Sequence, residues 1–81
     1  MDRTTALDAV REVAIEVLSV DAEQVTEAAR FKEDLDADSL DLVELVMGLE
    51  EKFDITVPEE DLDDVTTVGH AVDLVLSKVS A

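Results

Sequence analysis

Three aspartates stand at alternate positions just before a serine, in the stretch DLDADSLDLVEL over residues 34–45. This spacing fits two kinds of chemistry. Alternating carboxylates can wrap a calcium ion, as they do in the loop of an EF-hand. Alternatively, the loop presents Ser39 at the start of a helix, where free backbone N–H groups and the helix dipole would stabilise a phosphate esterified to its hydroxyl.

The EF-hand pattern is only half present in this stretch. Asp34, Asp36 and Asp38 occupy the first three ligand positions. Ser39 stands where the pattern has Gly, and Leu45 stands where it has a bidentate Glu. We therefore expect no dedicated calcium site. An acidic calcium-binding or interaction module, in which Ser39 is only a helix cap, remains an alternative.

Ser39 has no neighbour in the sequence that would make it a catalytic nucleophile. Such a serine needs an adjacent base, and the only histidine, His70, lies in the predicted last helix with no triad spacing around it. The chain contains no cysteine, so it has no thiol nucleophile of its own. We expect a protein that is not an enzyme, in which any group on Ser39 is attached by another enzyme.

The composition and net charge indicate a small acidic domain. The 81 residues form one domain, residues 1–81, and 47% of them are hydrophobic. The 22 acidic and 6 basic residues give a net charge of -16, which repels nucleic acid and anionic membranes and attracts basic proteins. The sequence shows neither a signal peptide nor a membrane-spanning apolar stretch. We expect a cytoplasmic monomer.

The spacing of apolar residues predicts an all-α fold, a small four-helix bundle with three longer helices and one short helix. The first helix is expected to begin with Thr5 as its cap and to end near Ser19. A long loop over residues 20–37 follows, and such a loop needs apolar anchors in a compact domain. The expected anchors are Val25, Phe31 and Leu35.

Capping residues predict where the remaining helices begin. The second helix is predicted to start at Asp38 or Ser39, since both residues are good N-caps. Pro58 at a first helical position opens a short acidic helix, and Thr66 or Thr67 caps the last one.

The second helix is predicted to carry two apolar faces. Gly48, inside it, should cost about 1 kcal/mol relative to Ala and loosen the helix end. The face expected to pack into the core holds Leu42, Leu45, Val46, Leu49 and Phe53. The other face should point away from the core, as a docking surface with an apolar centre and a charged rim. Its apolar residues are Leu40, Val43 and Met47, and its rim is Glu44, Glu50 and Glu51. Packing of this face under the last helix or the loop is the alternative.

Residues 34–68, DLDADSLDLVELVMGLEEKFDITVPEEDLDDVTTV, resemble the acyl carrier proteins of dissociated (type II) bacterial fatty acid synthesis. Asp38-Ser39-Leu40 matches the attachment motif of that family. The features that follow it also stand in the family's order. They are the acidic helix, the turn at Pro58 with the acidic residues after it, and the start of the last helix at Thr66-Thr67-Val68. Asp36 departs from the family pattern, because many members have Gly at this position.

The resemblance implies a carrier of acyl chains. Ser39 would carry a 4'-phosphopantetheine arm, transferred from coenzyme A by a magnesium-dependent phosphopantetheinyl transferase, with acyl chains held as thioesters on the arm. Basic patches of fatty acid synthesis enzymes would dock on Asp38, Leu40, Asp41, Val43, Glu44, Met47, Glu50 and Glu51. An acyl pocket would be lined by Phe31, Leu35, Val46, Leu49, Val57, Leu62, Val65 and Val68. A polyketide or other secondary-pathway carrier is the nearest alternative.

Overall fold

The computed structural model describes residues 2–79, and this part of the chain is mostly helical. Its elements are α1 (Arg3–Leu18), η1 (Ala22–Gln24), α2 (Ser39–Phe53), η2 (Glu59–Asp64) and α3 (Val68–Val79), where η marks a 3₁₀ helix. Over these residues the one β-type pairing is an isolated bridge between Arg30 and Thr67. The predicted all-α bundle of three longer helices and a short one is confirmed, with η1 as a further short turn.

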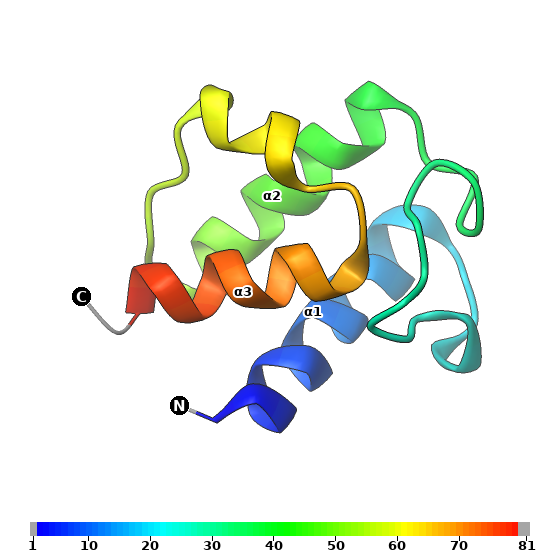
Figure 1. The fold of residues 1–81 in the computed structure, drawn as a ribbon, viewed down its shortest axis with the longest axis horizontal. Helices are drawn as coiled ribbons and strands as arrows, with labels where there is room; N and C mark the ends of the chain where they lie inside the picture. The colour runs from blue at the N-terminus through cyan, green and yellow to red at the C-terminus, as the bar shows by residue number, and fades with distance from the viewer. Residues whose placement is uncertain (1, 80–81) are drawn as a thin grey trace.

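The three α-helices do not share their contacts equally. α1 packs against both α2 and α3, whereas α2 and α3 contact each other much less. Figure 1 shows the first loop, coloured cyan to green, at the end of the bundle where α1 stops and α2 and α3 begin. Of the helices in residues 2–79, none is both long and apolar enough to cross a membrane.

α1 begins earlier than the sequence predicted, because Asp2 and not Thr5 is its N-cap. The Asp2 carboxylate accepts a hydrogen bond from the Thr5 N–H at 2.8 Å, and this bond holds the pKa of Asp2 below its usual range. The helix ends at Leu18, close to its predicted end. The prediction failed because Asp and Thr are both good caps, so the pattern alone could not choose between them.

The short helix η2 also begins one residue away from its prediction. Pro58 was expected at the first helical position, but it precedes the helix as the N-cap and has an extended backbone with ψ of 149°. Three acidic residues occupy the first turn of η2, as the sequence pattern indicated. The difference is within the usual uncertainty of a helix boundary, and the short acidic helix itself is confirmed.

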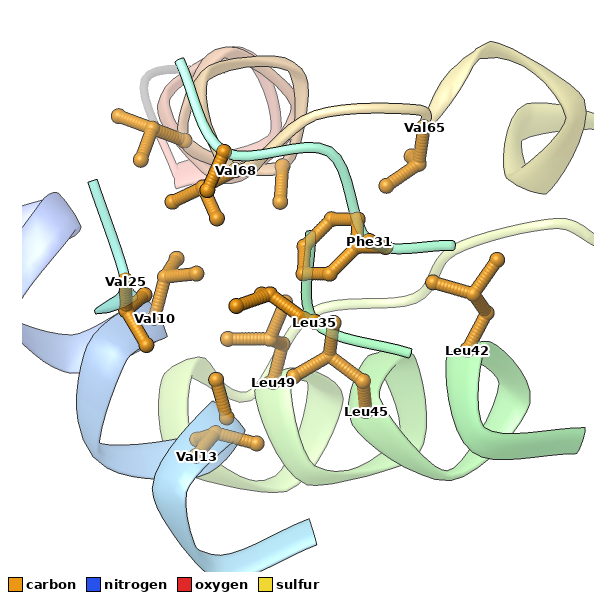
Figure 2. Packing of buried hydrophobic residues seen from close by; sticks show 14 of the residues in the cluster. Val10, Val13, Val25, Phe31, Leu35, Leu42, Leu45, Leu49, Val65 and Val68 are labelled. Atoms are coloured by element: carbon orange, nitrogen blue, oxygen red, sulfur yellow. The ribbon is translucent and has the colours of Figure 1, made fainter. Parts of the chain in front are cut away.

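The core is one apolar cluster filled by the α-helices, the first loop and Val65, the residue that follows η2 (Figure 2). Phe31, Leu45 and Leu49 are its largest side chains with essentially no exposed surface. Burying a side chain of this kind stabilises the fold by about 1.5–3 kcal/mol. Of the two phenylalanines, the fully buried one, Phe31, therefore comes from a loop and not from a helix.

The first loop is pinned at several points. Val25, Phe31 and Leu35 are buried, which confirms them as its anchors. The Phe31 N–H donates a hydrogen bond to the Thr66 carbonyl at 3.1 Å, and the Val68 N–H donates one to the Ala29 carbonyl at 2.9 Å. These contacts tie the loop to the start of α3, so that the residues before Ser39 have a fixed position.

Gly48 lies where α2 approaches α1. A Cβ atom at this position would lie 2.7 Å from Cγ1 of Val13, a side chain of α1 that is only 6% exposed. The helix continues to Phe53, and Asp54 closes it in the left-handed conformation with φ of 54°. The expectation of a looser helix end was therefore wrong, because Gly48 serves the packing of two helices.

We expect Gly48→Ala to destabilise the domain by up to about 2 kcal/mol, because overpacking a filled site costs about 1–3 kcal/mol and the gain in helix propensity offsets about 1 kcal/mol of that cost. Chemical denaturation of the two proteins measures the difference. Adding Val13→Ala should restore part of the loss, because it removes the Cγ1 atom in the way. A Gly48→Ala variant more stable than the parent would contradict the close approach.

Acidic residues far outnumber their basic partners. Of the 22 acidic residues, seven make ion pairs in the described part of the chain, so that 15 have no cationic partner there. The paired side chains are all partly exposed, and such pairs contribute only about 0–1 kcal/mol each. Repulsion among the acidic side chains therefore opposes folding.

We expect screening of this repulsion to raise the melting temperature by about 5 °C or more between roughly 10 and 200 mM NaCl. Millimolar Mg²⁺ or Ca²⁺ should act in the same direction. Thermal melts followed by circular dichroism at each ionic strength provide the measurement. A melting temperature that does not change with salt would contradict the argument, and tight stoichiometric Ca²⁺ binding would revive the calcium-binding alternative.

Candidate functional site

Ser39 is the first residue of α2, and its side chain is exposed. The cap of this helix is Asp38, whose carboxylate accepts a hydrogen bond from the Asp41 N–H at 2.9 Å. The Asp41 carboxylate in turn accepts one from the Asp38 N–H at 3.2 Å. Among residues 2–79 the Ser39 hydroxyl has no hydrogen-bond partner. The alternative in which Ser39 is only a cap is therefore wrong, and its hydroxyl is accessible to a modifying enzyme.

The loop before Ser39 is fixed by its backbone. The Ala37 N–H donates a hydrogen bond to the Phe31 carbonyl at 2.8 Å, which holds the two ends of this turn together. Asp36 has a φ of 57°, in the left-handed region that favours Gly and that Asp tolerates better than most residues. Asp36 thus has the backbone conformation for which Gly would be the usual choice.

Two of the three alternating aspartates, Asp34 and Asp38, make side-chain hydrogen bonds within the protein. The Asp34 carboxylate accepts hydrogen bonds from the Arg30 backbone N–H at 2.8 Å and from the Arg30 guanidinium at 3.3 Å. These bonds hold the pKa of Asp34 below its usual range. Leu45, where an EF-hand needs Glu, is fully buried. In residues 2–79 no three His, Asp or Glu side chains are placed to hold a metal ion, so nothing favours the calcium-binding alternative.

A pocket of about 490 Å³ opens beside Ser39, bounded by the start of α2, the first loop, η2 and the link from η2 to α3. Its apolar lining consists of Phe31, Leu42, Val43, Leu62 and Val65. Figure 2 shows three of these, Phe31, Leu42 and Val65, grouped together although they come from three different segments. The polar lining consists of Ser39 with Arg30, Lys32, Glu33, Glu59, Asp63, Thr66 and Thr67. An apolar wall therefore meets a polar rim at the serine.

Only some of the residues expected around an acyl chain line this pocket. Phe31, Leu62 and Val65 do so. The other five do not line it. Val57 is half-buried in the segment after α2, and the remaining four are buried in the core: Leu35, Val46, Leu49 and Val68. The sequence did not single out Leu42 or Val43 as lining residues, because helical periodicity cannot reveal where a loop leaves space beside a helix.

The second apolar face of α2 is exposed, as predicted. Leu40, Val43 and Met47 retain 65%, 38% and 57% of their accessible surface. The alternative that this face packs under the last helix or the loop is therefore wrong. Glu44 and Glu51 beside it are exposed, and neither makes an ion pair with another of the residues 2–79.

Glu50 differs from the other acidic residues of this helix because its carboxylate is already engaged. It is half-buried and accepts a hydrogen bond from the Val57 N–H at 2.9 Å. Glu50 therefore holds the connection between α2 and η2 in position. The sequence gave no sign of this contact, because no local pattern relates residues seven apart across a helix end.

His70 belongs to the start of α3 and is not a base for Ser39. Its Nδ1 accepts hydrogen bonds from the Thr66 hydroxyl at 2.8 Å and from the Thr67 N–H at 3.3 Å. The Thr67 hydroxyl accepts a bond from the His70 N–H at 3.2 Å, which confirms Thr67 as a cap. The ring lines a separate hollow and not the pocket beside Ser39.

Comparison with known proteins gives a consistent result. Residues 8–75 match the family model described as phosphopantetheine attachment site. The chain is 48% identical over 81 residues, all of both chains, to an acyl carrier protein of Rubrobacter xylanophilus. It is 54% identical over 65 residues, 80% of this chain and 86% of the relative, to that of Wolinella succinogenes. It is 46% identical over 74 residues, 91% of each chain, to that of a Picosynechococcus species.

Proposed function

Because the chain belongs to the acyl carrier protein family, we propose that Ser39 is the residue that bears its 4'-phosphopantetheine group. The observation that carries this proposal is the exposed Ser39 hydroxyl, which has no hydrogen-bond partner in residues 2–79, at the start of α2 beside a pocket. The chain is a carrier and not an enzyme, so its partners include acyl chains, the enzymes that process them and a phosphopantetheinyl transferase.

The residues around Ser39 fit such a group. The bound phosphopantetheine supplies a terminal thiol that holds an acyl chain as a thioester, chemistry that a chain without cysteine lacks. The N-terminal end of α2 stabilises the phosphate next to Ser39 through the helix dipole. Asp38 and Asp41 satisfy each other's backbone N–H groups, so the helix end keeps its structure while the serine side chain stays available.

We propose that partner enzymes dock on the exposed face of α2. Leu40, Val43 and Met47 form its apolar centre, and Glu44 and Glu51 supply the exposed charge at its rim. Such an arrangement fits a basic patch that surrounds an apolar contact. Asp38, Asp41 and Glu50 are further acidic contacts in this proposal, although all three also make hydrogen bonds within the protein.

We also propose that the pocket beside Ser39 shelters part of an attached acyl chain. The support is its position next to Ser39 and the apolar wall formed by Phe31, Leu62 and Val65 with Leu42. A chain that reached further would have to separate residues that are now fully packed in the core, such as Leu49.

The pathway that we propose is type II fatty acid synthesis, with a polyketide or other secondary pathway as the alternative. The support is the resemblance over residues 34–68 and the similarity to chains named acyl carrier protein. We propose a cytoplasmic monomer, in keeping with a net charge of -16, which opposes self-association.

Intact mass of the protein purified from its native cell tests the function. We expect a mass increase of one phosphopantetheine group, with a fraction that also carries acyl groups. Fragmentation should locate the increase on Ser39. Unmodified protein under conditions of active lipid synthesis would contradict the proposal, and the identity of the acyl groups would separate fatty acid from polyketide synthesis.

A further inference from the structure

Lys32 differs from every other basic residue of this chain. Over residues 2–79 it is the one Lys or Arg that makes no ion pair. The five basic residues that do have acidic partners are Arg3, Arg11, Arg30, Lys52 and Lys78. An unpaired cation is unexpected in a chain with 22 acidic residues, and Lys32 lines the pocket beside Ser39.

The backbone brings Lys32 close to the start of α2. Lys32 follows Phe31, whose carbonyl accepts the Ala37 N–H at 2.8 Å, and Ser39 lies two residues beyond Ala37. Phe31 is fully buried and its N–H is bonded to the Thr66 carbonyl, so this part of the turn is held firmly. The exposed side chain of Lys32 has a flexible four-carbon stem, and it can therefore move over the pocket rim while its backbone stays fixed.

The other charges of the pocket do not account for this cation. Arg30 and Glu33, which also line it, form an ion pair at 2.8 Å, and Arg30 binds Asp34 as well. Glu59 and Asp63 on η2 are the remaining acidic lining residues, and neither forms an ion pair with Lys32. A free positive charge next to a surface that receives basic partners slows their encounter, unless another anion neutralises it.

We propose that Lys32 is a positioning residue that pairs with the phosphate esterified to Ser39. This inference rests on the proposed attachment at Ser39. The phosphate is a diester with one negative charge, and its bond to Oγ keeps it at the pocket rim that Lys32 and Ser39 share. The ammonium group of Lys32 offsets the repulsion that Asp38 and Asp41 exert on that charge and favours the arm lying along the pocket.

The test compares apo and holo forms of four proteins: the parent, Lys32→Gln, Lys32→Arg and Lys52→Gln. Lys52→Gln is the matched control, because it also removes one positive charge, but from a lysine that is paired with Glu12. Intact mass first establishes that each holo form carries the arm, which tests the attachment itself. For each protein we compare the rise in melting temperature from the apo to the holo form at low salt. This rise should be about 1–5 °C smaller in Lys32→Gln than in the parent. The ³¹P resonance of Lys32→Gln should also differ from that of the parent, and this difference should shrink at high salt.

Lys32→Arg and Lys52→Gln should keep the parental ³¹P resonance and the parental effect of the arm on melting. Identical resonances in loaded parent and loaded Lys32→Gln would overturn the proposal while leaving attachment at Ser39 intact. A lower melting temperature of apo Lys32→Gln with an unchanged ³¹P resonance would overturn it too, because Lys32 would then pair with Glu59 or Asp63. Failure of Lys32→Gln alone to take up the arm would assign Lys32 to transferase recognition and would equally reject the phosphate contact.

Discussion

Ser39→Ala is expected to abolish attachment of the phosphopantetheine group while leaving the fold nearly unchanged. Attachment requires a hydroxyl, and among residues 2–79 the one exposed serine hydroxyl at the start of a helix is that of Ser39. The helix cap survives the substitution, because Asp38 and not Ser39 accepts the Asp41 N–H. We therefore expect a change in unfolding free energy within about 0.5 kcal/mol, as for other exposed positions.

The measurement is intact mass after incubation with coenzyme A, Mg²⁺ and a purified phosphopantetheinyl transferase. Ser77→Ala is a matched control, since Ser77 is also exposed in an α-helix but lies in α3. It should load like the parent. An arm on Ser39→Ala would reject the assignment of the site. Unfolding of Ser39→Ala would show instead that the hydroxyl supports the helix start, in spite of the Asp38 cap.

The sequence predicted the helices and the exposed serine because both depend on local rules. Apolar periodicity and N-cap residues predicted where α2 and α3 begin to within a residue. The 100° turn per residue along α2 separated the buried Leu45 from the exposed Met47. The anchors of the loop were also found, since a long loop in a small domain must bury its apolar residues. These inferences use spacing within one segment and need no knowledge of its neighbours.

The features that the sequence missed depend on contacts between segments. From the sequence, Gly48 was interpreted as a residue that weakens its helix. That interpretation missed Val13, which fills the space beside Gly48 but belongs to another helix. Glu50 was interpreted as a charge at the rim of the docking surface. The sequence could not show that its carboxylate accepts a hydrogen bond from the Val57 backbone N–H. The pocket beside Ser39 is bounded by four segments, so periodicity within one segment could propose apolar lining residues but could not distinguish them from core residues.

Reversal of Glu44 is expected to slow transfer of the arm and to weaken binding of basic partner enzymes by about 10-fold at low salt. Glu44 is exposed on α2 beside Val43 and Met47, and no cation among residues 2–79 offsets its charge. Glu44→Lys therefore places a positive charge on the rim without disturbing the core. The effect should fall toward the parental value as ionic strength rises, because rim charges act mainly on the rate of encounter.

Met47→Ala separates the apolar contact from the charge. Met47 is 57% exposed and lies on the same face, so truncation removes contact area at the centre of the proposed interface. We expect about 5-fold weaker binding that persists at all salt concentrations, measured by titration calorimetry alongside Glu44→Lys.

Glu23→Lys is the control for net charge in the docking experiment. Glu23 is exposed in η1, outside α2, and forms no ion pair with any of the other residues 2–79. Its reversal changes the net charge by the same amount as Glu44→Lys, so a partner that senses only total charge must respond equally to both. Equal losses from Glu23→Lys and Glu44→Lys, together with parental binding of Met47→Ala, would show that no local surface is recognised. A loss confined to the α2 variants would mean that partners contact this face directly, next to the serine that bears the arm.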